Sequence, residues 1–289
     1  MFLPRKILED RLRTVLAEDL GQGDITTGLI VPAETTAEAE VVSKESGIAA
    51  GIEEAKILLE SLNIKAEPLV ADGAKVRPKQ VLIKICGDAR TILSVERTLL
   101  NVLSRMSGIA TMTRNLIGKL RNSGAKTKVA CTRKTAPGLL YFDKKAVQVG
   151  GGDTHRLHLD DMILIKDNHI AVAGSLKEAV KKAKENASLS KKVEVEVTKI
   201  EDVLTAAEAG VDIIMLVNFL PRQIEKAVEL LKKKKLYGKA LLEASGGITA
   251  ENILSFSSTG VDIVSLGAIT QSAKTLDIGL EITRIKKQP

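Results

Sequence analysis

From about residue 126 onward, short apolar runs alternate with longer stretches of helical periodicity. The apolar runs are VAC (129–131), MILI (162–165), VEVEV (193–197), DIIML (212–216), ALLE (240–243) and VDIVSL (261–266). Between them lie stretches such as SLKEAVKKAKENA, with Gly210 where a helix would end and Pro221 where one would begin. About six repeats of strand and helix predict a parallel sheet covered by helices, either a closed barrel or an open doubly wound sheet.

The first hundred or so residues have a different pattern. The opening MFLPRKILEDRLRTVLAEDL brings in charges early and indicates an amphipathic helix rather than a signal peptide. Short apolar runs, Gly/Pro turns and the helical stretch EEAKILLESL then predict a separate α+β domain, joined to the repeats by the long helical stretch ARTILSVERTLLNVLSRMSGIATMTRNLIGKL. We expect an α+β domain over residues 1–108 and a barrel domain over 109–269, with residues 270–289 packing back on the first domain.

Composition narrows the class of protein. Apolar residues make up 44% of the 289 residues and charged residues 27%, which is typical of a globular protein. No apolar run approaches the roughly 20 residues that cross a bilayer, so we expect a cytoplasmic protein without membrane contact. Cys86 and Cys131 lie far apart and outside any CxxC, which argues against a structural zinc or a disulfide framework.

The net charge of +7 raises the possibility of a nucleic-acid binder. Two Tyr, four Phe and no Trp leave little for stacking on unpaired bases, so we expect no nucleic-acid partner. The lysine run at 232–235 is typical of a solvated helix face. A basic protein still favours small polyanionic substrates.

Polar and glycine residues follow the predicted strands, at the rim where parallel barrels carry their active sites. They are Thr132-Arg133-Lys134, Lys166-Asp167-Asn168-His169, Val217-Asn218, Ala244-Ser245-Gly246-Gly247 and Gly267-Ala268. Arg133 and Lys134 alone fit surface charges equally well, and Gly246-Gly247 alone fits an ordinary turn. However, the glycine pair precedes ITAENILSF, a predicted helix start whose N–H groups suit a phosphate. Together these segments predict an anion-binding pocket.

Glu194 and Glu196 lie on one face of VEVEV because side chains alternate along a strand. They fit a strand with one solvated face, but both faces of a parallel sheet are usually covered, which favours a functional role.

All three histidines lie in THRLHLDDMILIKDNH, residues 154–169. His155 and His158 precede the predicted strand and His169 follows it. At about 3.3 Å per residue the strand separates them by roughly 13 Å, so they cannot share one metal ion unless the loops fold back. Arg156 and Lys166 would also repel a cation. The stretch therefore predicts donors for an acidic substrate rather than a zinc site.

Several long motifs resemble the quinolinate phosphoribosyltransferase family. They are EDLGQGDITT, ERTLLNVLSRMSGIAT, TRKTAPGLL, GGGDTHRLHLDDMILIKDNHI, VEVEV, EASGGIT and SLGAITQSAKTLDIGLEI, nearly end to end. The resemblance implies an incomplete α/β barrel of about six strands with a smaller α+β domain at the N-terminus. It also implies a pentosyltransferase of NAD biosynthesis. Such an enzyme joins quinolinate to phosphoribosyl pyrophosphate, with Mg²⁺ as cofactor, and releases pyrophosphate, CO₂ and nicotinate mononucleotide.

The resemblance also implies the site residues. Quinolinate is expected on Arg133, Lys134, His155, Arg156 and Lys166, with Arg97 supplied by the neighbouring subunit of a homodimer or higher even oligomer, and Thr132 is a further expected substrate-binding residue. The phosphoribosyl end is expected on Glu196, Ser245, Gly246, Gly247, Leu266, Gly267 and Ala268, and Lys134, Lys166 and Glu196 are the expected catalytic residues. Arginine suits a dicarboxylate because its planar fork holds a carboxylate bidentately.

One position departs from the family pattern. Where the family usually has an Asp associated with ribose and metal binding, this chain has Val217. The metal ligands are therefore undetermined from sequence, with Glu196 as a candidate and Asn218, Glu194 or Glu243 as possible substitutes. Val217 also leaves open a same-fold relative with another acceptor, such as a nicotinate phosphoribosyltransferase or the molybdenum-associated paralogue. A Schiff-base aldolase using Lys166 is a further alternative from the fold alone.

Overall fold

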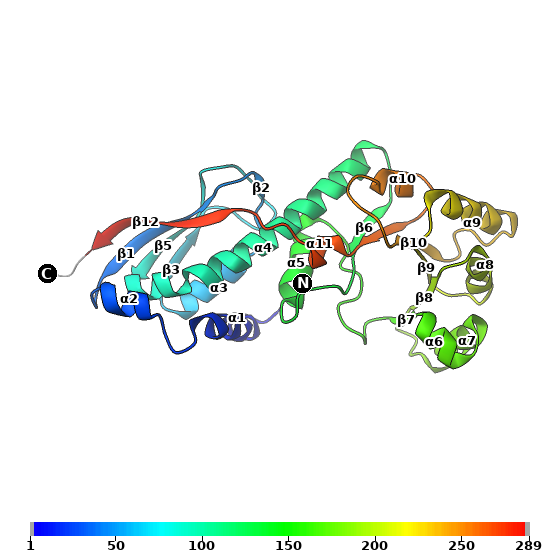
Figure 1. The fold of residues 1–289 in the computed structure, drawn as a ribbon, viewed down its shortest axis with the longest axis horizontal. Coiled ribbons are helices and arrows are strands. Elements are labelled where there is room, and N and C mark those ends of the chain that lie inside the picture. Colours follow the sequence, from blue (N-terminus) through cyan, green and yellow to red (C-terminus); the bar gives the residue numbers. More distant parts are fainter. Residues whose placement is uncertain (1–2, 287–289) are drawn as a thin grey trace. The chain divides into compact units, whose positions relative to one another are not determined.

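The computed structural model describes residues 3–286. The chain divides into two compact units (Figure 1). Of the described residues, the first unit contains 3–114, 141–151 and 273–286, and the second contains 115–140 and 152–272. The long helix α4 (Ala89–Asn122) begins in the first unit and ends in the second.

The first unit is built on an antiparallel sheet of four strands. Their order is β12 (Ile278–Lys286), β1 (Thr36–Ser43), β5 (Gln80–Asp88) and β3 (Lys65–Pro68), and β2 (Gly47–Ile48) pairs separately with β4 (Lys75–Val76). Helices α1 (Arg5–Leu20), α2 (Ile25–Ile30) and α3 (Ile52–Ser61) belong to the same unit. Leu8, Leu12 and Leu16 recur every four residues and form the buried stripe of α1. The predicted α+β domain is thus present.

Helix α5 (Leu140–Gly150) is held in the first unit by charged anchors, although sequence reasoning placed its residues in the barrel domain. The Nε and Nη2 atoms of Arg105 donate to the two carboxylate oxygens of Asp143 at 2.7 and 2.8 Å, and Asp143 is fully buried. Arg114 donates to the backbone carbonyls of Val149 and Gly150. These long-range pairs bind α5 to α4, and local periodicity contains no signal for them.

The second unit is a parallel sheet of six strands with helices between them. The order is β6 (Lys128–Cys131), β11 (Ile263–Leu266), β10 (Leu241–Ser245), β9 (Ile213–Val217), β8 (Val193–Val197) and β7 (Ile163–Ile165). Its helices are α6 (Asp167–Ala173), α7 (Leu176–Asn186), α8 (Ile200–Glu208), α9 (Pro221–Lys233), α10 (Ile253–Ser257) and α11 (Ala268–Gln271). All six predicted strands exist, and the prediction of an incomplete six-stranded α/β barrel is confirmed.

The barrel is incomplete because β6 and β7 are edge strands. Asp153 adds to the free edge of β6: its N–H donates to the carbonyl of Val129 at 2.8 Å, and its carbonyl accepts the N–H of Cys131 at 3.1 Å. The loop after α5 is therefore anchored at the open side of the barrel. This anchor fixes the position of the backbone two residues before His155.

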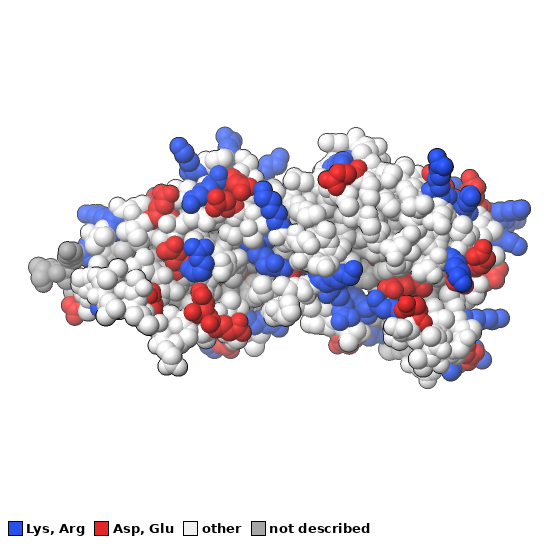
Figure 2. All heavy atoms as spheres, in the orientation of Figure 1, with Lys and Arg blue, Asp and Glu red and all other residues white. Residues whose placement is uncertain are grey.

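The lysine run at the end of α9 lies on the surface. Lys232–Lys235 are exposed, as predicted from the sequence for a solvated face. On the face drawn in Figure 2, basic and acidic side chains are interspersed over both units. Within residues 3–286, no helix has the length and apolarity to span a membrane. Cys131 is buried and Cys86 is half-buried, and they form no disulfide.

Candidate active site

The carboxyl ends of the barrel strands surround a cavity of about 600 Å³, a volume that suits a small-molecule site. Its wall contains every expected site residue but one: Thr132, Arg133, Lys134, His155, Arg156, Lys166, Glu196, Ser245, Gly246, Gly247, Leu266, Gly267 and Ala268. The exception is Arg97, an exposed residue of α4 in the first unit. Residues separated by more than a hundred positions thus meet at one rim because their strands are parallel neighbours.

The wall also contains residues that sequence reasoning did not assign to the site. They are Cys131, Leu164, Met215, Ile248, Ser265 and Gln271. Leu164, Met215 and Ser265 are strand positions whose side chains point into the barrel, so the alternation of each strand was the signal that could have found them.

The three histidines have three different surroundings. His169 Nδ1 accepts the N–H of Lys166 at 2.9 Å and thereby caps the start of α6. His158 is exposed, and its N–H donates to the carboxylate of Asp161 at 3.0 Å. Of the three, only His155 lies in the cavity wall. The histidines therefore do not converge on one metal ion.

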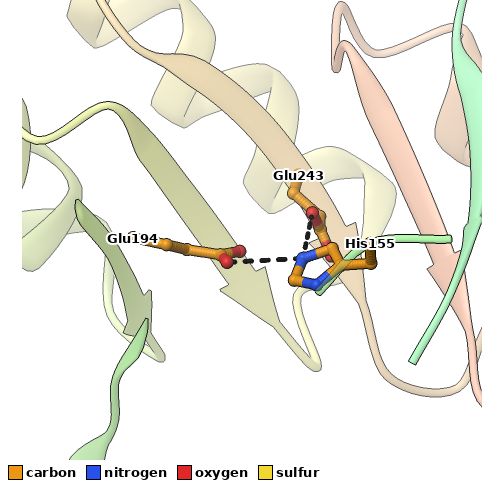
Figure 3. Close-up of side chains that lie close together, drawn as sticks. All are labelled: His155, Glu194 and Glu243. Atoms are coloured by element: carbon orange, nitrogen blue, oxygen red, sulfur yellow. Dashed lines mark ion pairs between the residues drawn. The ribbon is translucent and has the colours of Figure 1, made fainter. Parts of the chain in front are cut away.

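His155 instead meets two glutamates from different strands (Figure 3). Its Nε2 lies 3.3 Å from Oε2 of Glu194 on β8 and 3.3 Å from Oε2 of Glu243 on β10. Both carboxylates are fully buried. Burial disfavours the charged ring, but the two glutamates outweigh it and raise the pKa of His155 to about 10. The ring is therefore a cation at neutral pH.

The same burial raises the pKa of Glu194, and the neighbouring charge of Glu243 adds to the effect. These three residues are close enough to hold a metal ion together. Without a metal ion, the raised pKa of His155 makes the three residues an ion-paired layer, in which the protonated imidazole has no lone pair for a metal. From the sequence, Glu194 was expected to be functional as part of the VEVEV strand, and both glutamates were possible substitutes for a missing metal ligand. Their pairing with His155 was not predicted.

Lys166 and Glu196 form a second ion pair, in the open part of the cavity. Lys166 follows β7, Glu196 lies on the adjacent strand β8, and Lys166 Nζ is 2.9 Å from Oε1 of Glu196. Glu196 is one-fifth exposed and Lys166 nearly half exposed, so both side chains are accessible to a ligand. The cavity thus contains an accessible carboxylate among cations.

The basic side chains of the cavity influence one another. Burial and the nearby charge of Arg133 lower the pKa of the Arg156 guanidinium. Crowded cations of this kind are stabilised by an anion that enters between them. Arg133, Lys134, Arg156 and Lys166 therefore make the cavity suited to a substrate with several negative charges.

The glycine turn after β10 needs its glycines for a steric reason. Gly246 has φ of 89° and Gly247 has φ of 65°, the left-handed region that side chains disfavour. A Cβ on Gly246 would collide with the side chain of Asn218, which itself has φ of 59°. The Asn218 N–H donates to the carbonyl of Ser245 at 2.8 Å, so the ends of β9 and β10 are tied together.

The helix predicted directly after the glycine pair begins later. Helix α10 starts at Ile253, because Asn252 Nδ2 donates to the carbonyl of Gly247 at 2.9 Å and Asn252 Oδ1 accepts the N–H of Thr249 at 2.7 Å. These bonds shape residues 247–252 as a loop. Exposed backbone groups of the turn itself, rather than a helix terminus, are thus the feature available to a phosphate.

The turn after β11 packs against the turn after β6. Gly267 precedes α11, and a Cβ there would lie 3.2 Å from Cδ of Lys134. The backbone carbonyl of Lys134 accepts the Thr270 hydroxyl at 2.8 Å. Ser265 donates its hydroxyl to that of Ser245 at 2.9 Å. Close approach of these turns keeps the cationic residues after β6 beside the glycine turns.

Val217 ends β9 and lies, half-buried, in the cavity wall opposite Ser245 in the strand register. Its side chain offers neither a hydrogen bond nor a metal ligand. The position is therefore an apolar patch in an otherwise polar part of the wall.

Comparison with known proteins agrees with this site. The family models of the quinolinate phosphoribosyl transferase N-terminal and C-terminal domains match residues 24–107 and 109–281. The probable nicotinate-nucleotide pyrophosphorylase (carboxylating) of Methanothermobacter thermautotrophicus is 43% identical over 277 residues, covering 96% of this chain and 99% of that protein. That of Methanocaldococcus jannaschii is 45% identical over 275 residues, covering 94% and 96%. The solved structure of the nicotinate-nucleotide pyrophosphorylase from Francisella tularensis has a TM-score of 0.88 and 39% identity, covering 98% of both chains. The chain belongs to the quinolinate phosphoribosyl transferase family.

Proposed function

We propose that this protein transfers the phosphoribosyl group of phosphoribosyl pyrophosphate to quinolinate, with loss of one carboxylate. The products are nicotinate mononucleotide, pyrophosphate and CO₂, and the reaction belongs to NAD biosynthesis. The observation that carries this proposal is the convergence of four cationic side chains and two glycine turns on one cavity. Its relatives with 43% and 45% identity are named for the same activity.

The part of the site expected to bind quinolinate consists of positively charged hydrogen-bond donors. Arg133 and Arg156 offer planar forks for the two carboxylates of quinolinate, and Lys134 and Lys166 add point charges. His155 adds a further cation in the floor of the same cavity. These fixed charges orient the pyridine ring so that its nitrogen faces the ribose.

The donor half lies at the turns after β10 and β11. Ser245, Gly246 and Gly247 would take the 5-phosphate of the phosphoribosyl group, together with the turn of Leu266, Gly267 and Ala268. Backbone N–H groups in turns with positive φ suit phosphate oxygens, as in anion-binding nests. The left-handed geometry of the glycine pair supports this role.

The chemistry needs stabilisation of a positive charge and then of an electron pair. As the pyridine nitrogen bonds to C1 of the ribose, the C–O bond to pyrophosphate breaks and positive charge develops on the ribose. Glu196 is the accessible carboxylate that would stabilise this charge, and Lys166 holds it in place. Loss of CO₂ leaves an electron pair on the ring carbon beside the cationic nitrogen, and a proton then completes the product.

Mg²⁺ fits this donor set as an ion shared with the substrate. It is usually held by one or two carboxylates together with phosphate oxygens and water. Glu196 supplies one accessible carboxylate, whereas Glu194 and Glu243 are buried against His155 and Val217 supplies none. When bound, Mg²⁺ would neutralise charge on the departing pyrophosphate.

Arg97 fits a role in an assembly. It is exposed on α4, and its own chain's cavity is lined by residues of the second unit. We propose that the protein forms a homodimer or higher even oligomer in which Arg97 reaches the cavity of the neighbouring subunit. Mixing an Arg97→Ala subunit with a Glu196→Gln subunit tests this arrangement, because only a shared site regains activity in the mixture.

The alternative is a same-fold enzyme that takes nicotinate as its acceptor, and the observation that favours it is Val217 in the cavity wall. Calorimetric titration separates the two possibilities. Pairing of the second carboxylate with an Arg is worth about 1.5–3 kcal/mol, so quinolinate should bind at least about tenfold more tightly than nicotinate. Equal affinities would favour the alternative.

A further inference from the structure

Two buried glutamates have no assigned part in the reaction proposed above. Glu194 and Glu243 lie on strands separated by β9, and both side chains are fully buried inside the barrel. Among the described residues 3–286, none of their four carboxylate oxygens has a hydrogen-bond donor. Burying two such carboxylates is costly unless a cation accompanies them. The cation in contact with both is the ring of His155 (Figure 3).

The contacts place one ring nitrogen between two carboxylates. Nε2 is equally distant from Glu194 and Glu243, at 3.3 Å, and points directly at neither. This geometry fits a single N–H shared by two anions. It constrains the position of Nε2 and the direction of its N–H, because the two oxygens belong to different strands.

Packing alone does not fix this ring. His155 and Arg156 line the active-site cavity and also a second cavity of about 760 Å³, whose other residues include Ile213, Leu241 and Ile263 at the opposite ends of the strands. The His155 side chain therefore borders open space on two sides. A side chain in such a place is free to tilt unless polar contacts hold it.

The backbone of His155 is constrained in the same direction. Its φ is 51°, a strained conformation for a non-glycine residue that persists only where the surroundings hold it. The Asp153 carboxylate accepts the His155 N–H at 2.7 Å, and Asp153 itself is anchored on β6. Strain and anchor together project the ring into the barrel.

The protonation of the ring decides what it offers to a ligand. A neutral histidine that directs its N–H at the glutamates has a lone pair on Nδ1, which repels a carboxylate. The imidazolium has an N–H at both nitrogens. With Nε2 held by the glutamates, Nδ1 is then a charged donor, and within residues 3–286 it has no hydrogen-bond partner.

We propose that Glu194 and Glu243 are positioning residues that hold His155 as a cation, with its Nδ1–H directed at a carboxylate of the acceptor. This inference rests on the proposed function for the identity of the acceptor. It assigns the two glutamates to acceptor recognition through His155, not to the ribose or to a metal ion.

Kinetics of the full-length protein test the proposal. Loss of an outer contact of this type typically costs about tenfold or more, so Glu243→Gln should raise the KM for quinolinate by about tenfold. The KM for phosphoribosyl pyrophosphate should stay within about twofold, because the glycine turns are unaffected. Glu194→Gln should behave alike, and Glu225→Gln on the exposed face of α9 is the matched control. Equal increases in both KM values would contradict a role in acceptor recognition.

A double-mutant cycle shows whether the glutamates act through the histidine. In a His155→Asn background, Glu243→Gln should cause no further rise in the quinolinate KM. An additive rise would overturn the proposal.

Nitrogen NMR of the wild-type imidazoles provides a readout independent of turnover and of variant folding, since the chain has only three histidines. One imidazole should stay protonated at both nitrogens up to pH 8. Three imidazoles that are neutral at that pH, or one stoichiometric metal ion bound to an imidazole nitrogen, would overturn the proposal. If the wild-type protein has this protonated imidazole but does not turn over quinolinate, the proposed function is contradicted instead.

Discussion

Lys166, directly after β7, and Glu196, on the adjacent parallel strand β8, place an ammonium 2.9 Å from a carboxylate in the accessible part of the barrel cavity. The pair shows how the fold creates its site: single residues at successive strand ends become neighbours because the strands lie side by side. It also supplies the cavity with a carboxylate fixed in position before a substrate enters. Preorganised charge of this kind stabilises a transition state without reorganisation at the moment of reaction.

Replacing Glu196 tests the role of this carboxylate. Glu196→Gln keeps the shape of the side chain but removes the charge that would stabilise the developing ribose cation. We expect kcat to fall by about 100-fold, the loss typical of one preorganised electrostatic group, while the KM for quinolinate changes little. Steady-state kinetics with both substrates varied checks this, and Glu208→Gln on the exposed side of α8 is the control. A kcat close to that of the wild type would show that Glu196 is not catalytic.

Arg133 is expected to bind a quinolinate carboxylate. Its charged hydrogen bonds are worth about 1.5–3 kcal/mol, so Arg133→Ala should raise the KM for quinolinate by roughly 10- to 100-fold or abolish turnover. The KM for phosphoribosyl pyrophosphate should be much less affected. The control is Arg222→Ala at the exposed start of α9. It also removes one arginine charge, but Arg222 does not line the cavity, so the kinetics should not change. Near-normal kinetics in Arg133→Ala would reject the assignment.

Val217 allows a gain-of-contact experiment. Val217→Asp would add a carboxylate to the wall that already contains Glu196 and Ser245. A charged contact of about 1.5 kcal/mol should lower the Mg²⁺ concentration needed for half-maximal activity by about tenfold. Activity measured over a Mg²⁺ titration checks this, with Val217→Asn as the uncharged control. Unchanged Mg²⁺ dependence would mean that position 217 takes no part in metal binding in this chain.

The layer of His155, Glu194 and Glu243 should give folding stability a dependence on pH. The folded pKa of His155, about 10, lies above the ordinary value of 6.5, so the stabilisation by the protonated ring is complete below pH 6.5. It is lost as the pH rises through about 10. For one proton the unfolding free energy should fall by at most about 1.4 kcal/mol per pH unit in this range.

Urea denaturation between pH 7 and 10 measures this slope. The control is an uncharged layer made by His155→Asn, Glu194→Gln and Glu243→Gln together, which lacks all three titrating groups but keeps similar volumes. Parallel slopes in the wild type and this variant would show that the layer does not bind an additional proton in the folded state.

Asp143 should be essential for the stability of the first unit. It is fully buried and accepts two hydrogen bonds from Arg105, which is one-fifth exposed. Asp143→Ala leaves the guanidinium without its partner, and breaking a buried pair costs about 3–5 kcal/mol. Asp10→Ala removes the exposed ion pair with Lys6 on α1 and should cost less than about 1 kcal/mol. Chemical denaturation of both variants compares them, and similar small losses would contradict a structural role for Arg105–Asp143.

Much of the fold was predictable because its signals are local. Each barrel strand is a short run rich in apolar residues, or alternating valine and glutamate in β8, that can be recognised from its own residues alone. The predicted strands differ from the observed ones by at most two residues at either end. Polar residues after those runs predicted the cavity because the carboxyl ends of parallel strands meet at one rim.

The unpredicted features depend on contacts between distant residues. The pairing of His155 with Glu243 depends on a loop anchored at the edge of β6 and on a residue inside β10. Helix α5 joins the first unit through Arg105 and Asp143, whose side chains come from different helices. The late start of α10 results from the hydrogen bonds of Asn252 to its own loop. Side-chain geometry of this kind is not encoded in hydrophobic periodicity.

Turnover with quinolinate, phosphoribosyl pyrophosphate and Mg²⁺ tests the central claim most directly. CO₂ release and nicotinate mononucleotide formation would be followed together, with nicotinate as the parallel acceptor. Our account predicts equal amounts of the two products from quinolinate and no product from nicotinate. Product from nicotinate, or nicotinate mononucleotide without matching CO₂, would contradict it.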